Sequence, residues 1–364
     1  MTAPLSIALL TYSTKPRGSV VHTLALAEAL AAAGQRVTIW TLGRGGDAGF
    51  FRRVDREVQQ RIVPFPDRPG ETVGERVLRS IAALREAFDA DSYDIVHAQD
   101  CISANAVDLC VRTVHHIDHF TTPELVTCHE RAIVTPYAHV CVSDAVAAEL
   151  AAGWGIKAKV IPNGVAYDRF AAAAADLQAR AEWKARLGRY VLTVGGIEPR
   201  KGSLDLLEAY ALLHVHHSDI RLVVAGGETL FDYRDYRARF EARATQLGVE
   251  PVILGAVPDD DLPSLVADAD AFAFPSTNEG FGLAAMEALA AGVPLVVRDL
   301  PVLREVFGLA ARFAASPAAL AAELRHALEV PDPKRRSAGR ALAVRHTWEA
   351  AATEHLDFYR SLGA

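Results

Sequence analysis

A short segment in the second half of the chain constrains the fold more than any other. Ala271–Phe274 is an apolar run that ends at a proline, which predicts a short buried strand. Gly280 and Gly282 allow the backbone to turn tightly. From Leu283 apolar residues recur at helical spacing until Gly292, which predicts a helix. A strand, a glycine turn and a helix in this order indicate an open α/β sheet with an anion site at the start of the helix.

Two carboxylates lie on this segment. Glu279 is in the turn, and Glu287 is about one turn inside the helix. Beside a positive helix terminus, such carboxylates can accept hydrogen bonds from sugar hydroxyls while the backbone holds phosphate. The alternative is that Glu279 only complements the helix dipole and that Glu287 is a solvated helix residue.

Similar strand–helix units recur along the whole chain. The predicted strands of the first half are Leu5–Leu10, Arg36–Trp40, Tyr93–His97, Val111–Val114, His139–Val142 and Lys159–Ile161. Those of the second half are Tyr190–Val194, Arg221–Ala225, Val252–Leu254 and Ala271–Phe274. The predicted helices cover about 19–33, 73–88, 101–110, 203 onward, 234–247, 316–329 and 335–362. Two such series predict an α/β protein with two Rossmann-like domains that face each other across a cleft.

The length agrees with two domains, since 364 residues exceed one typical core. We expect an N-terminal domain over residues 1–166 and a helical linker over 167–188. A second domain follows over 189–340, and a C-terminal helix over 341–364 packs back on the first domain.

Composition narrows the class of protein. A hydrophobic content of 51% with 23% charged residues indicates a globular chain, and the net charge of −7 argues against nucleic-acid binding. The four cysteines show no CxxC spacing, so we expect reduced thiols. The N-terminus lacks a basic leader, and no apolar run reaches membrane-spanning length. These features favour a cytoplasmic protein.

Two segments have no clear assignment and are expected to form loops. Residues 43–60 carry four arginines that could contact acidic lipid head groups. Interleaved acidic residues favour a solvated surface instead, so peripheral membrane contact is not supported. Residues 115–137 match no motif.

Cations and histidines follow several predicted strands. Lys201, preceded by Arg200, lies between a strand and a helix, where an ammonium group can meet phosphate oxygens; the alternative is a solvated Lys-Arg pair. Gly18 is in the first strand-to-helix turn, which could hold phosphate but lacks the GxGxxG pattern of dinucleotide sites. The histidines lack metal-ligand spacing, so we expect no metal and leave open that they are plain core or surface residues; they are His97, His115, His116 and His119.

The acidic segment resembles a known family. Asn278-Glu279-Gly280-Phe281-Gly282-Leu283, then Met286-Glu287-Ala288 and Gly292-Val293-Pro294, resemble the Glu-x7-Glu signature of retaining nucleotide-sugar glycosyltransferases of family 4, which have the GT-B fold. The resemblance implies that Glu279 contacts the transferred sugar and that Glu287 contacts the nucleotide ribose. It also places Gly280, Phe281, Gly282 and Leu283 against the donor.

Other segments extend the resemblance. Pro162-Asn163-Gly164-Val165 resembles the turn that closes the first domain, and Thr113-Val114-His115 resembles a segment whose histidine lies near the transferred sugar. Gly18 matches the second glycine of a turn that approaches the donor diphosphate, with Arg17 replacing the first.

The diphosphate clamp of the family matches only in part. Lys201-Gly202 resembles its end, but Gly196 stands where the family usually has arginine. Either Arg200 compensates, or the diphosphate is held by one cation fewer. Val257 follows a strand whose turn lies against the nucleotide base in the family.

These observations predict a retaining glycosyltransferase. It moves a hexose from a UDP- or GDP-sugar to a small-molecule, glycan or lipid acceptor without a metal. Two alternatives remain, a sugar-nucleotide epimerase of similar architecture and a non-catalytic nucleotide-sugar binder. Product analysis with donor alone distinguishes the epimerase from the transferase. A turnover assay combined with donor titration distinguishes the non-catalytic binder from the transferase.

Overall fold

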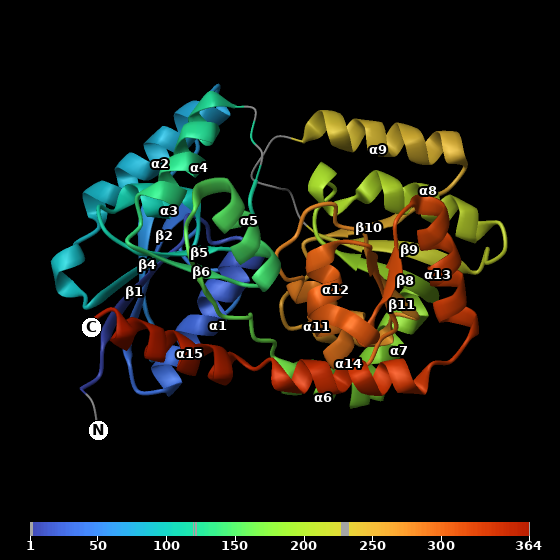
Figure 1. Ribbon diagram of the computed structural model, residues 1–364. Coiled ribbons are helices and arrows are strands. Elements are labelled where there is room, and N and C mark those ends of the chain that lie inside the picture. The colour runs from blue at the N-terminus through green and yellow to red at the C-terminus, as the bar shows by residue number, and fades with distance from the viewer. Residues whose placement is uncertain (1–2, 119, 121, 227–232, 364) are drawn as a thin grey trace. The chain divides into compact units, whose positions relative to one another are not determined.

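The protein is an α/β protein with two parallel sheets, as the strand–helix alternation predicts (Figure 1). A computed structural model describes residues 3–118, 120, 122–226 and 233–363. The chain divides into two compact units, one made of residues 1–164 and 348–364 and the other of residues 165–347.

The sheet of the first unit has seven strands in the order β3-β2-β1-β4-β5-β6-β7, and every pairing is parallel. The strands are β1 (Ser6–Leu10), β2 (Arg36–Arg44), β3 (Gln59–Phe65), β4 (Ile95–Ala98), β5 (Val111–Val114), β6 (Ala138–Cys141) and β7 (Lys159–Val160). β1 lies between β2 and β4 and is almost entirely buried, which explains its uninterrupted apolar sequence.

Helices cover both faces of this sheet (Figure 1). They are α1 (Gly18–Ala32), α2 (Val73–Ala87), α3 (Cys101–Ala106), α4 (Pro123–Val134), α5 (Asp144–Trp154) and α15 (Trp348–Ser361). The C-terminal α15 packs against α1 in this unit. Its Tyr359 is fully buried, and the Tyr359 hydroxyl lies 2.7 Å from Nδ1 of His97 on β4.

The sheet of the second unit has six parallel strands in the order β10-β9-β8-β11-β12-β13. They are β8 (Arg189–Val194), β9 (Ile220–Ala225), β10 (Val252–Gly255), β11 (Ala271–Phe274), β12 (Leu295–Arg298) and β13 (Arg312–Ala314). Its helices are α6 (Tyr167–Ala175), α7 (Leu177–Leu187), α8 (Ser203–His214), α9 (Arg234–Leu247), α10 (Leu262–Asp268), α11 (Leu283–Ala290), α12 (Pro301–Phe307), α13 (Pro317–Glu329) and α14 (Pro333–Arg345).

The segment predicted as a linker, 167–188, forms α6 and α7, and both helices pack against α10 of the second unit. Asp176 lies between the two helices, and its carboxylate accepts hydrogen bonds from the first N–H groups of α7. This cap ends one helix and begins the next within two residues.

Three secondary-structure expectations were wrong. β3 begins at Gln59, where the sequence analysis expects a polar loop, because an edge strand exposes most of its side chains and tolerates Pro64. α4 lies inside the expected loop 115–137, with a proline at its first turn and a buried apolar stripe. The helix expected over 335–362 is interrupted at residues 346–347, which separates α14 from α15.

β12 and β13 complete the second sheet beyond β11, and the sequence analysis assigned no strand to either. β13 has only three residues and lies at the sheet edge, so it offers little periodicity to detect. All four cysteines are free thiols. Within the part of the chain that the structure describes, none of the helices combines the length and the apolar character needed to cross a membrane.

Candidate functional site

The turn between β11 and α11 is shaped by Gly282. All four residues of β11 are buried, and Gly282 precedes α11 with a φ of 94°. A Cβ atom at Gly282 would lie 3.1 Å from the Phe307 ring and 3.3 Å from that of Phe274, so a larger residue would be both strained and crowded. No side chain of Gly282 can cap α11, and its first N–H groups are therefore available at the turn.

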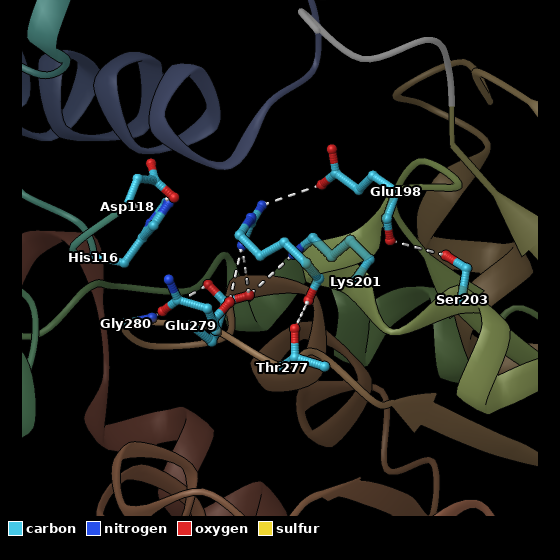
Figure 2. Close-up of polar contacts among 10 residues, drawn as sticks. His116, Asp118, Glu198, Lys201, Ser203, Thr277, Glu279 and Gly280 are labelled. Carbon is cyan, nitrogen blue, oxygen red and sulfur yellow. Dashed lines mark hydrogen bonds and ion pairs between the residues drawn. The ribbon is translucent and has the colours of Figure 1, made fainter. Parts of the chain in front are cut away.

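Glu279 pairs with both predicted phosphate-binding cations in this turn (Figure 2). Lys201 Nζ donates to Glu279 Oε2 at 3.0 Å, and Arg200 Nη1 lies 3.4 Å from the same oxygen. The Glu279 side chain is only 13% exposed, which strengthens both interactions relative to a surface ion pair.

Backbone contacts hold the Arg200-Lys201 segment against the turn. Thr277 N donates to Arg200 O at 2.8 Å, and Arg200 Nη1 donates to Asn278 O at 3.2 Å. The Arg200 guanidinium also pairs with Glu198 at 3.3 Å (Figure 2). The position of both cations is therefore determined by contacts with a turn that lies 78 residues further along the chain.

Gly202 allows this close approach. Its φ is 66°, and a Cβ atom there would lie 2.2 Å from Pro275 O. Any other residue would have to push the Lys201 turn away from the end of β11. The glycine after Lys201 is thus required by packing as well as by backbone conformation.

Opposing effects act on the pKa of Lys201. Burial and the neighbouring Arg200 lower the pKa of Lys201, whereas Glu279 and Glu198 raise it. The ammonium also lies 5.2 Å from the centre of the Phe274 ring. A partly desolvated ammonium interacts more strongly with an incoming anion than a solvated one does.

Glu287 lies on α11 and is partly buried. Burial raises the pKa of its carboxyl group to about 8, Arg169 opposes that shift, and Asp259 adds to it. Arg169 itself pairs with Asp259 at 2.8 Å. Within the part of the chain that the structure describes, the Glu287 carboxylate makes no hydrogen bond or ion pair, so its oxygens can accept hydrogen bonds from a ligand.

The other expected donor-side residues belong to the same unit. Gly196 follows β8 and lines a small cavity together with Gly195, Lys201 and Ser203. Val257 follows β10 and is partly buried. Gly280, Phe281, Gly282 and Leu283 continue from Glu279 into α11.

Gly18 and His115 lie in the first unit. Gly18 is exposed and begins α1, with no heavy atom within 4 Å of the position of an added Cβ. His115 follows β5, and its ring lies edge-on to that of His22 at 4.8 Å. Burial lowers the pKa of His115 well below its usual value, and its Nε2 is buried without a hydrogen-bond partner. The imidazole is therefore neutral.

His115 belongs to a histidine cluster that the sequence analysis did not find. His22 Nδ1 lies 2.9 Å from Asn163 Oδ1, and His97 Nε2 lies 2.7 Å from Thr113 Oγ1. His355 of α15 contacts both His22 and His97. These residues come from distant parts of the chain, so their spacing in the sequence carries no signal.

No metal ligand set emerges from the described residues, in which no group of three or more His, Cys, Asp or Glu side chains is arranged to hold an ion. His116 pairs with Asp118 at 3.1 Å, and His119 lies outside the described residues. In the Asp268-Ala269-Asp270 segment, Asp270 makes structural contacts: it accepts a hydrogen bond from Tyr190 N and pairs with Arg189.

Comparison with known proteins assigns a family to both halves of the chain. Residues 178–342 match the family described as glycosyl transferases group 1, and residues 16–169 match glycosyltransferase family 4. A D-inositol 3-phosphate glycosyltransferase of Jonesia denitrificans is 30% identical over 94% of this chain and 90% of its own length. O-antigen chain mannosyltransferase B of Escherichia coli is 36% identical over 48% of this chain, and the match spans 46% of that protein.

Solved structures give the fold. HepE of Anabaena in complex with UDP and glucose superposes with a TM-score of 0.74 at 19% identity, over 98% of this chain and 99% of HepE. Together with the family matches, this likeness confirms the expected GT-B fold. The chain belongs to the group 1, family 4 glycosyltransferases and is a transferase enzyme of that family.

Proposed function

We propose that the protein transfers a hexose from a UDP- or GDP-sugar to a small-molecule, glycan or lipid acceptor with retention at the anomeric carbon. The observation that carries the proposal is the cluster of Lys201, Arg200 and Glu279 at the start of α11. Two cations and the N–H groups at the start of α11 suit a diphosphate, and the adjacent carboxylate suits sugar hydroxyls.

The charges of this cluster match those that develop in the reaction. The bond from the anomeric carbon to phosphate breaks, so positive charge grows on the sugar ring and negative charge on the departing diphosphate. Lys201, Arg200 and the N–H groups of 280–283 stabilise the leaving diphosphate. Glu279 orients the sugar through its hydroxyls. A new bond forms from the anomeric carbon to the acceptor oxygen, and the acceptor proton passes to the departing phosphate oxygen.

Glu287 binds the nucleotide in this proposal. Its carboxyl group has no partner among the described residues and accepts hydrogen bonds from the ribose hydroxyls. Val257 contacts the base, Gly196 and Gly18 approach the phosphates, and His115 lies near the transferred sugar. The missing arginine at Gly196 is replaced by Arg200, which is supported by its position beside Lys201 on Glu279.

The names of the relatives support a nucleotide-sugar donor. One is a mannosyltransferase, one is an inositol-phosphate glycosyltransferase, and HepE was crystallised with UDP and glucose. Because Lys201, Arg200 and the helix terminus supply the positive charge, the reaction needs no metal ion. Four free thiols support a cytoplasmic location, where nucleotide sugars are substrates.

A thermal-shift screen across UDP- and GDP-hexoses tests the proposal. The true donor should raise the melting temperature in proportion to its occupancy, and Glu287→Gln should weaken that effect. Turnover of the stabilising donor is then followed as nucleoside diphosphate release with a panel of acceptors. If no nucleotide sugar stabilises the protein at millimolar concentration, the proposed donor site is wrong.

A further inference from the structure

Two arginines of the first unit lie together, and neither forms an ion pair with any residue that the structure describes. Arg17 directly precedes α1, and Arg44 is the last residue of β2, the strand beside β1 in the sheet (Figure 1). Arg44 interacts electrostatically with Arg17, with Arg76 and with the Tyr12 hydroxyl, so these groups share one site. Like charges lie together here at the carboxyl end of a parallel sheet, where ligands of α/β proteins bind.

Neither arginine is paired within the part of the chain that the structure describes. The side chains of Arg17 and Arg44 make no ion pair or hydrogen bond there, and the Nε atom of each is buried without a partner. Burial lowers the pKa of Arg44, and the neighbouring guanidinium groups of Arg76 and Arg17 add to that shift. Leaving two partly desolvated guanidinium groups without an acceptor is unfavourable, and an anion would remove that penalty.

Uncharged polar groups without partners lie at the same strand ends. Thr11 follows β1, Thr41 lies in β2, and Gln99 follows β4; all three side chains are fully buried. The Thr11 and Thr41 hydroxyl groups and both amide atoms of Gln99 lack hydrogen-bond partners. Thr11 N bonds to Trp40 O at 3.0 Å, and Gln99 N bonds to Leu10 O at 2.9 Å, so the three strand ends are in register.

The nearby carboxylates do not neutralise the arginines. Asp100 accepts hydrogen bonds from Tyr12 N at 2.8 Å and Ser103 N at 2.8 Å. Asp67 influences Arg44 electrostatically but is exposed and forms no ion pair with it. Burial also raises the pKa of Tyr12 to about 12, so its hydroxyl stays protonated and can donate to an anion.

From this cluster we infer that Arg17 and Arg44 bind a phosphate group carried by the acceptor, so that the enzyme uses a phosphorylated acceptor. The inference rests on the proposed transfer reaction, because it names the acceptor class for that reaction. Two guanidinium groups match the size and charge of a phosphomonoester, and Arg binds phosphate oxygens in a fork geometry.

Inorganic phosphate is the first probe. The protein is saturated with UDP or GDP, whichever binds, so that the diphosphate region at Lys201 is occupied, and phosphate is then titrated by calorimetry. We expect one further phosphate to bind wild type, Arg44→Lys to bind more weakly, and Arg17→Gln and Arg44→Gln to lose at least tenfold in affinity. The matched control Arg56→Gln, at an exposed position of the same unit, should bind as wild type does.

The acceptor preference is the second readout. Glucose 6-phosphate and glucose form a matched pair, and we expect wild type to favour the phosphorylated sugar by about a hundredfold in kcat/KM, a preference that Arg44→Gln should reduce to about tenfold or less. Circular dichroism and melting curves exclude misfolded variants.

Two outcomes overturn the inference alone. Phosphate binding that UDP or GDP abolishes would place the anion at the donor site, and equal binding by wild type and Arg44→Gln would exclude the arginine pair. In both cases nucleotide binding and slow donor hydrolysis by wild type would leave the transfer reaction standing. Absence of nucleotide binding would instead remove the proposed function, and the inference with it.

Discussion

The two sheets carry their charged groups in opposite ways at their carboxyl ends. In the second unit Lys201 and Arg200 share the Glu279 carboxylate, so both cations are held in place before any ligand binds. In the first unit Arg17 and Arg44 lie together without an ion pair among the described residues. The same unit also holds neutral buried histidines. In a paired cluster the carboxylate offsets the repulsion between the cations. In an unpaired cluster only a bound anion can offset that repulsion.

The largest expected difference between the units is their response to acid. Burial lowers the pKa of His22 to about 3 and that of His355 to about 4, so both stay neutral in the folded state while unfolded histidine takes up a proton near pH 6.5. Their contribution to stability is therefore present at neutral pH and is lost as the pH falls below 6.5. Each should lower the free energy of unfolding by about 1.4 kcal/mol per pH unit.

Hydrogen exchange from pH 7 to 5 measures this response in each unit. We expect α1 and α15 to lose protection before the strands of the second sheet. His355→Asn should reduce the slope by about one proton, because it removes the titrating imidazole while it keeps a donor for Ala351 O. The exposed His326→Asn should leave the slope unchanged. Equal loss of protection in both units would contradict the prediction that the first unit is more sensitive to acid.

The second prediction removes the paired cation of the second unit. Lys201→Ala should reduce turnover about a hundredfold, because one of the groups that stabilise the leaving diphosphate is gone. Lys184→Ala, which removes a surface lysine 3.7 Å from Asp270, is the matched control and should leave turnover unchanged. Steady-state kinetics with a saturating donor measure both. Unchanged turnover in Lys201→Ala would exclude Lys201 from the mechanism.

The third prediction tests the packing that brings Lys201 to Glu279. Gly202→Ala should lower the free energy of unfolding by about 2 kcal/mol or more, because its Cβ would lie 2.2 Å from Pro275 O in addition to the strain of positive φ. Gly248→Ala has nearly the same φ, 67°, but open space around the Cβ, and should cost only about 1 kcal/mol. Chemical denaturation compares the two, and equal losses would show that the close approach is unimportant.

The fourth prediction concerns Glu287, whose response to pH is opposite to that of the histidines. Its pKa is raised to about 8, so the protonated carboxyl stabilises the folded state at low pH, and that contribution is lost as the pH rises from about 4.5 through 8. Glu287→Gln should remove this pH dependence and weaken nucleotide binding about tenfold. Denaturation curves at pH 5 and 8, with a nucleotide titration, measure both. An unchanged pH dependence would place Glu287 in solvent.

Local patterns were sufficient for much of the fold. β1, β11 and α9 lie within a residue or two of their predicted ranges, and α8 begins at its predicted start. Buried strands and capped helices leave a period and an end signal in a few adjacent residues. β3, β13 and α4 were not predicted. An exposed edge strand, a three-residue strand and a helix inside an unassigned polar segment carry weaker signals.

By itself, the sequence determined the strand–turn–helix that carries Glu279 and Glu287, together with the family resemblance, since both depend on spacing within about twenty residues. Only the tertiary structure brought Lys201 to Glu279 across 78 residues and assembled four histidines from α1, β4, the end of β5 and α15. It also brought Arg17 and Arg44 together with no ion pair to either among the described residues. Contacts between distant segments arise from sheet order and helix packing, and no local period records them.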